Sequence, residues 1–375
     1  MMKQTLVQQF SETQQTTCSL VPDYIMLTDT ISDAMLEKLE NLDITSKNKL
    51  IVCIDHDTPN SSIAVGKKQR RLLTWALDRN ITVEKCQGIG YIRLLESYVK
   101  HNDIIAGTGY HMAGLGAAGA LGIRMTEDEL WETIKNDKVT LPHPVVLTIS
   151  LTGTMPNYVS IQDVALAIQK EYSNKIDDHT LIVFKDETGL TTDQRYDLCH
   201  FAQQYGACSA LFTEETISCN TRFDISATQP LVVLPGTSNQ TEYLGALHDI
   251  HVNEVFIGGC RGGKLEDLRA AAAILKGKHI AYRLRLVVTP ATSSIYLQAL
   301  REGLIDIFLD CGAVVMNQGC SVCWGKAQGI LDAGEVLVST GSYHYPGCCG
   351  DTNADVYLAS PCTAAHCAIT GTLSE

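Results

Sequence analysis

Three cysteines in glycine-rich segments are the residues of this chain best suited to chemistry. Cys260 lies in Gly-Gly-Cys-Arg-Gly-Gly, and Cys320 and Cys323 form a Cys-x-x-Cys pair flanked by glycines. Three thiolates in such loops can bind three of the four irons of an iron–sulfur cluster. The fourth iron is then open to substrate and acts as a Lewis acid.

The Cys-x-x-Cys pair alone has other interpretations. A structural zinc site usually needs a second pair at similar spacing, and the sequence has none. A redox dithiol would precede a helix early in a thioredoxin-like fold, which fits this position poorly. The adjacent Cys348 and Cys349 suit one tetrahedral ion badly, but either could approach the open iron as a fourth thiolate and close it. In a chain without an export signal, the 14 cysteines are expected to be reduced.

Composition limits the class of protein. The chain has 375 residues, enough for two or three domains, with 45% apolar and 19% charged residues. The net charge of −13 argues against nucleic-acid binding, because no basic surface would match a phosphate backbone. No run of about 18 apolar residues and no signal peptide is recognisable, so we expect a cytoplasmic protein that does not cross a membrane.

Short apolar segments alternate with helical patterns along the chain. Strands are predicted at 50–54, 81–85, 103–106, 145–151, 181–185, 231–234, 255–258 and 284–289, and helices at 69–80, 161–171, 265–275 and 294–303. This alternation predicts an α/β protein with mostly parallel sheets. Functional loops are then expected at the carboxyl ends of strands, where the polar and glycine-rich segments fall.

A second glycine-rich segment, 107–122, contains Gly114-x-Gly116-x-x-Gly119 and superficially suggests a nucleotide-binding loop. It does not follow directly after a strand, and no acidic residue lies about 20 positions further on in a strand–helix–strand context. We therefore interpret these glycines as points of close helix packing.

Several segments together resemble the aconitase superfamily, and most closely the large subunits of 3-isopropylmalate dehydratases. The most specific are the Cys260 loop with the helix after it, the Cys320/Cys323 loop, and the ending Tyr357-Leu358-Ala359-Ser360-Pro361-x-Thr363-Ala364-Ala365. Upstream segments also resemble the family: Asp55-His56, Gly107-Thr108-x-x-His111 and Gly153-x-x-Pro156. The likeness covers about residues 50–372.

The resemblance implies a three-domain α/β core around a central [4Fe–4S] cluster, with domains at 1–145, 146–246 and 247–375. The mobile swivel domain of the family is absent from this segment of sequence. In the dehydratases it is a separate small subunit, so we expect this chain to act with such a partner.

The resemblance also implies roles for individual residues. Cys260, Cys320 and Cys323 would bind the cluster, whose open iron would take a substrate hydroxyl and carboxylate. His56 and His111 would lie near the departing hydroxide as catalytic residues, with Asp55 orienting His56. The implied activity is the dehydration and isomerisation of 3-isopropylmalate or a related hydroxy acid, hence leucine biosynthesis.

Part of the family's substrate-binding set is changed here. The changes are Lys264, Tyr343 and Cys348 at arginine positions, Tyr91 for a histidine, Gly109 for an aspartate and Gln204 for a glutamate. A lysine does not reproduce the two-pronged grip of an arginine on a carboxylate.

Two functions fit this pattern. One is a dehydratase with an altered, less anionic substrate, bound by Lys264, Tyr343 and His344 in place of arginines. The other is a protein that has lost hydratase chemistry and uses the cluster for structure, sensing or regulation.

Overall fold

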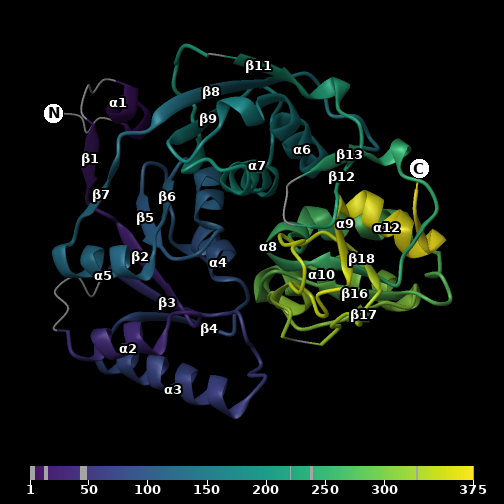
Figure 1. The fold of residues 1–375 in the computed structure, drawn as a ribbon, viewed down its shortest axis with the longest axis horizontal. Helices are drawn as coiled ribbons and strands as arrows, with labels where there is room; N and C mark the ends of the chain where they lie inside the picture. Colours follow the sequence, from purple (N-terminus) through teal and green to yellow (C-terminus); the bar gives the residue numbers. More distant parts are fainter. Residues whose placement is uncertain are drawn as a thin grey trace.

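The computed structural model of the chain describes residues 5–11, 16–42, 49–219, 221–236, 240–326 and 328–374. Its larger sheets have five, four and seven strands and follow one another along the sequence, each with helices packed around it (Figure 1). Two small sheets pair β1 (Thr17–Leu20) with β7 (Val139–Pro142) and β14 (Ile250–His251) with β20 (Thr372–Leu373). In the described residues, no helix is long and apolar enough to span a bilayer.

The N-terminal sheet is parallel, with the strand order β4-β3-β2-β5-β6. All five residues of β3 are buried, as expected for a strand covered on both faces. The strands are β2 (Tyr24–Thr28), β3 (Leu50–Ile54), β4 (Thr82–Lys85), β5 (Ile104–Gly107) and β6 (Leu121–Arg124). The helices of this part are α1 (Leu6–Ser11), α2 (Asp33–Glu40), α3 (Ile63–Asp78), α4 (Gly90–Ser97), η2 (Met112–Ala118) and α5 (Glu127–Asn136).

The middle sheet is also parallel, in the order β10-β9-β8-β11. Its strands are β8 (Val145–Thr152), β9 (Thr180–Asp186), β10 (Ser209–Phe212) and β11 (Thr221–Asp224). The helical segments are α6 (Ile161–Tyr172), η3 (Ser173–Lys175), α7 (Thr192–Gln204) and η4 (Ile225–Ala227). Ser160 and Thr191 begin α6 and α7 through capping boxes, which satisfy free amides of the first turn.

The C-terminal sheet is mixed, in the order β13-β12-β19-β18-β15-β16-β17. Only the pairings of β12 are antiparallel. The strands are β12 (Leu231–Val233), β13 (Thr241–Tyr243), β15 (Glu254–Gly258), β16 (Arg285–Thr289), β17 (Val314–Val315), β18 (Val336–Ser339) and β19 (Asp355–Leu358). The helical segments are η5 (Leu244–Ala246), α8 (Gly259–Gly262), α9 (Leu265–Leu275), α10 (Ser293–Arg301), α11 (Leu304–Asp310), η6 (Ser321–Trp324) and α12 (Pro361–Thr370).

The hydrophobic cores connect these sheets. One core joins residues of the N-terminal sheet to the C-terminal sheet and includes Cys260, while another joins the middle and C-terminal sheets and includes Cys323. The cysteine loops therefore lie where the three parts of the molecule meet.

The predicted α/β class with mostly parallel sheets is confirmed. β8 begins at Val145, at the first predicted domain boundary. β12 and β13 precede residue 246 but pair within the C-terminal sheet, so their hydrogen bonds place these two strands with the third part of the chain. The domain division itself stays a prediction.

Candidate active site

The Cys260 loop follows directly after the central strand β15. Gly259 adopts a φ of +75°, a left-handed conformation that other residues rarely take, and this turns the chain into the short helix α8. Cys320 directly precedes the 3-10 helix η6, and Cys323 lies within it. Cys260 and Cys323 are buried and Cys320 is half-buried. Burial raises the pKa of Cys320 and Cys323. The charges of nearby groups, including Asp55 for Cys320 and the thiol of Cys260 for both, raise it further, so the three predicted ligands are near enough to interact electrostatically.

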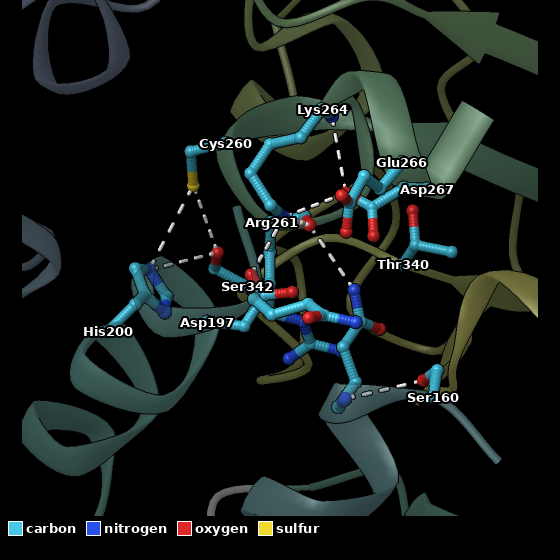
Figure 2. A network of polar contacts seen from close by, with 12 residues as sticks. Ser160, Asp197, His200, Cys260, Arg261, Lys264, Glu266, Asp267, Thr340 and Ser342 are labelled. Carbon is cyan, nitrogen blue, oxygen red and sulfur yellow. Dashed lines mark hydrogen bonds and ion pairs between the residues drawn. The ribbon is translucent and has the colours of Figure 1, made fainter. Parts of the chain in front are cut away.

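Cys260 has polar neighbours from two other parts of the chain. Its Sγ atom lies 3.2 Å from Ser342 Oγ and 3.9 Å from His200 Nε2, and Figure 2 shows both side chains directed at the sulfur. Burial opposes a charge on this thiol, but contacts with His200 and Ser342 and the charge of Lys264 lower the pKa of Cys260 below its ordinary value. A thiolate is the form that binds iron.

His111 and His200 form a stacked pair beside this thiol. Their ring centroids are 4.6 Å apart with planes 13° apart, and His111 Nδ1 lies 2.5 Å from His200 Nε2. Burial lowers the pKa of His111 to about 3 and that of His200 to about 4, so both imidazoles are neutral at pH 7. The hydroxyl of Tyr343 lies 3.4 Å from the remaining nitrogen of His111, Nε2.

His56 is in the opposite charge state. Its Nδ1 atom lies 2.8 Å from Asp55 Oδ1 and 3.3 Å from Asp29 Oδ1. Burial alone would lower the pKa of His56, but the charges and hydrogen bonds of Asp55 and Asp29 raise it to about 10. Asp55 accepts a further hydrogen bond, 2.7 Å long, from the Gly90 amide. The arrangement holds an imidazolium whose Nε2 proton is not used by either carboxylate.

His56 also contacts the Cys-x-x-Cys loop. Its ring packs edge-on against Trp324, with centroids 5.0 Å apart. Two amides of the same loop bond to the N-terminal part of the molecule, Asn317 to the Thr58 carbonyl at 3.0 Å and Gln318 to the Cys86 carbonyl at 2.9 Å. These contacts fix the loop against His56.

Lys264 is placed differently from the predicted substrate-binding role. Its ammonium group lies 2.8 Å from Asp197 and 2.7 Å from Asp267, and it also donates to the Arg261 carbonyl. Burial opposes the charge, but the two carboxylates raise the pKa of Lys264 above its ordinary value. Because these contacts already use the ammonium, the geometry favours a role in holding α9 and α7 together. Figure 2 shows Lys264 directed at Asp267 while Cys260 is directed at His200.

The remaining predicted residues lie on the loop after β18. Tyr343 is half-buried beside His111. His344 accepts a hydrogen bond from the Gly236 amide through its carbonyl. Gln204 holds the loop through a 2.7 Å hydrogen bond to the Ser342 carbonyl. The Sγ atoms of Cys348 and Cys349 lie 3.6 Å apart, and both residues pack in the same core as Cys323.

The three cysteines fit an iron–sulfur cluster better than a single ion. Two other groups in the described residues are compact enough for one ion, His111 with His200 and Cys260, and Asp29 with Asp55 and His56. Within the described residues, the three cysteine sulfurs do not form a group compact enough for one ion. A cluster holds each thiolate on a different iron, so its ligands lie further apart. Several buried polar atoms around these loops have no hydrogen-bond partner in the described part of the chain, among them His200 Nδ1, Ser321 Oγ, Trp324 Nε1 and the guanidinium nitrogens of Arg261. Such N–H and O–H groups are suited to donate to the sulfides of a cluster if they face it.

The glycine-rich segment 107–122 packs closely, as predicted. A side chain at Gly116 would collide with the backbone of Ala210 and Leu211 in β10, and one at Gly122 with the Met112 carbonyl. The packed element is a 3-10 helix, η2, which begins directly after His111. These glycines therefore help to position His111.

Sequence reasoning did not single out Asp29, His200 or Ser342. Asp29 follows β2, a strand that was not among those predicted from the sequence. His200 lies in α7, where residues 196–203 are all buried, so the helix shows no amphipathic pattern. The available signal was the spacing of Asp197, His200 and Gln204, polar residues at helical intervals in an otherwise buried helix.

Comparison with known proteins shows the family of this chain. A family model described as Aconitase family (aconitate hydratase) matches residues 2–220 and 232–371. The chain belongs to the aconitase family. This aconitase-family chain is 29% identical to the 3-isopropylmalate dehydratase large subunit 2 of Archaeoglobus fulgidus, over 94% of its own length and 92% of that protein.

Other aconitase-family relatives are similar. The homoaconitase large subunit of Thermus thermophilus is 28% identical, over 94% of this chain and 90% of that protein. The 3-isopropylmalate dehydratase large subunit of Elusimicrobium minutum is 31% identical, over 91% of this chain and 88% of that protein. The crystal structure of Thermococcus kodakaraensis aconitase X (holo-form) covers 95% of this chain and 88% of its own, with a TM-score of 0.53 at 11% identity. It supports the fold, and family membership makes the chain an aconitase-type hydro-lyase.

Proposed function

We propose that this chain is the large subunit of an iron–sulfur hydro-lyase that dehydrates and isomerises a hydroxy acid such as 3-isopropylmalate or a related compound. The proposal is supported by the contacts that bring a neutral His111, through His200, to Cys260 and a charged His56 to Trp324 of the Cys320/Cys323 loop. The relatives named 3-isopropylmalate dehydratase support this substrate class and a role in leucine biosynthesis.

The cysteines would hold a [4Fe–4S] cluster, which supplies a Lewis-acid iron for a substrate hydroxyl and carboxylate when it is bound. His56 is the proton donor: its Nε2 proton goes to the hydroxyl oxygen as the carbon–oxygen bond breaks, and the hydroxyl leaves as water. Asp55 and Asp29 keep His56 charged before the step and orient its ring. His111, neutral and fixed by Tyr343 and His200, is suited to accept or share a hydrogen bond with the leaving oxygen.

The substrate proton on the neighbouring carbon needs a base. We propose that a small swivel-domain subunit supplies it, because three similar proteins carry the name large subunit. Tyr343, His344 and Lys264 were predicted to replace substrate-binding arginines. Of these, Tyr343 has the geometry for substrate contact, since its hydroxyl reaches His111.

A second candidate function is a cluster-binding protein without hydratase activity. The specific observation that favours it is the Cys348/Cys349 pair, which packs in the same core as Cys323 and could supply a fourth thiolate. A fourth thiolate would close the open iron and remove the Lewis acid.

Anaerobic reconstitution with iron and sulfide, followed by Mössbauer spectroscopy with and without hydroxy acids, separates the two. One distinct iron that shifts when 3-isopropylmalate or malate is added supports the hydro-lyase. Four equivalent irons that do not respond contradict it and favour the scaffold. C260S and C323S should lose bound iron, whereas C311A, a buried thiol of the core, should retain it as a matched control.

A further inference from the structure

Two sequence changes in the site, Tyr91 and Gly109, are one structural feature. Tyr91 is the second residue of α4 and is 2% exposed. A side chain placed at Gly109 would collide with the Tyr91 hydroxyl. The phenol therefore occupies the space above position 109, and any larger residue there requires Tyr91 to leave.

The N-terminus of α4 fixes the phenol in this space. The Gly90 amide donates to Asp55 Oδ2 at 2.7 Å, which ties the first turn of α4 to the carboxylate that orients His56. A side chain at Gly90 would lie 2.5 Å from Met26 and 2.8 Å from Cys53, so α4 sits directly on the sheet. Tyr91 consequently has little freedom to move.

The Tyr91 phenol contacts the side chains of the candidate site. Its ring packs edge-on against His111, with centroids 5.2 Å apart and planes 80° apart. Asp55, Tyr343 and Cys320 are near enough to influence its electrostatics. Burial raises the pKa of Tyr91 well above its ordinary value, so the group is a neutral hydrogen-bond donor.

The hydroxyl of Tyr91 makes no hydrogen bond among the described residues, and it is not among the buried polar atoms without a partner. Its oxygen therefore keeps some accessible surface, although the residue as a whole is 2% exposed. An accessible hydroxyl without a protein partner is free to hydrogen-bond to water or to a bound molecule. Because the Tyr91 ring packs against His111, an oxygen of a ligand bound beside His111 is a suitable acceptor for this hydrogen bond.

We propose that Tyr91 is a specificity-determining residue of this site, whose phenol donates a hydrogen bond to a hydroxyl or carboxylate oxygen of the bound hydroxy acid, and that Gly109 provides the space for it. The proposal rests on the proposed hydro-lyase function. It adds a neutral donor next to His111, at a position where the family pattern has a charged or titratable pair.

The test compares Y91F with wild type in stability and in ligand binding. Y98F is the matched control, because the Tyr98 hydroxyl has a partner, Glu84, at 2.6 Å. We expect Y91F to melt at or above the wild-type temperature and Y98F to melt below it. Binding of 3-isopropylmalate, malate and lactate is then measured on reconstituted protein. Y91F should bind the acid that the wild type binds with an affinity about tenfold lower, which is the loss expected for one such hydrogen bond.

Steric coupling is tested with G109A. In the wild-type background it should lower the melting temperature and weaken binding, because its Cβ displaces the phenol; in a Y91A background it should be tolerated. Y91F that melts as low as Y98F, or that binds its ligand as wild type does, overturns the proposal while the hydro-lyase stands. A wild-type protein that binds none of the three acids contradicts the proposed function and the role of Tyr91 with it.

Discussion

Asp29 lies 3.3 Å from Nδ1 of His56, although 27 residues separate them in the sequence. Asp29 also accepts hydrogen bonds from the amides of His56 and Asp57 and, at 2.8 Å, from the side chain of Gln69. The second carboxylate on His56 is therefore itself held in place by the turn that follows β3. This second carboxylate distinguishes His56, which is charged at neutral pH, from an ordinary histidine.

We predict that D29N lowers both the pKa of His56 and the stability of the protein. The folded pKa of His56, about 10, lies above its ordinary value of 6.5, so its contribution to stability is complete below about pH 6.5 and is lost as the pH rises through 10. D29N should cost about 2–3 kcal/mol near neutral pH. Its difference from wild type should shrink toward pH 10. Calorimetric melting from pH 6 to 10 measures this, and a difference that does not change with pH would contradict it.

Removal of the Lys264 ammonium should destabilise the protein severely. K264M removes the only ammonium that contacts the buried Asp197 and Asp267 among the described residues, and loss of one partner of a buried ion pair typically costs about 3–5 kcal/mol. K38M is the control, because the Lys38–Asp128 pair is exposed and its loss should change stability by less than about 1 kcal/mol. Chemical denaturation of the two variants measures the difference. Near-wild-type stability of K264M would instead leave room for the predicted contact with substrate.

Hydrogen bonds to Cys260 should set the reduction potential of a bound cluster. H200L and S342A each remove a neighbour of the thiolate, which concentrates its negative charge and should lower the potential. The shift is expected to match one hydrogen bond, about 1 kcal/mol or about 40 mV. Redox titration followed by electron paramagnetic resonance measures it. H179A, an exposed histidine, should leave the potential unchanged.

The packing glycines should differ sharply in their tolerance of alanine. G116A places a Cβ against the backbone of β10, which cannot move aside, so we expect a loss of about 1–3 kcal/mol. G66A, in the interior of α3, meets only the Asn60 side chain at 3.6 Å and should be neutral or stabilising by up to about 1 kcal/mol. Thermal melting of the two variants compares them. Equal melting temperatures would show that η2 does not pack rigidly on β10.

The sequence predicted the regular elements well where local signals were strong. β3 and α9 have the predicted bounds, Leu50–Ile54 and Leu265–Leu275. α3 begins at Ile63 rather than near residue 69, because the Ser62 side chain caps its first turn. β2 was not identified, and with it the position of Asp29 was missed.

Contacts between distant segments could not be read from local patterns. Lys264 was expected to face substrate, and nothing in its neighbourhood of sequence indicates that Asp197, 67 residues away, binds it inside the protein. The collision between Tyr91 and position 109 likewise depends on how α4 packs against the segment that leads into η2. The roles of Cys260, Cys320, Cys323, His56 and His111 stay predictions, now with a geometry that supports them.

Cys260 and Cys323 lie in two different hydrophobic cores, and Cys320 is the most accessible of the three. Because Cys260 and Cys323 are buried, iron and sulfide would reach them most readily while these cores are still open. For this chain, maturation of the metal centre and completion of folding would be one coupled event, with Cys320 as the first point of attachment. Protein produced without an iron–sulfur supply would then close around empty ligands, and later loading would require part of the molecule to reopen.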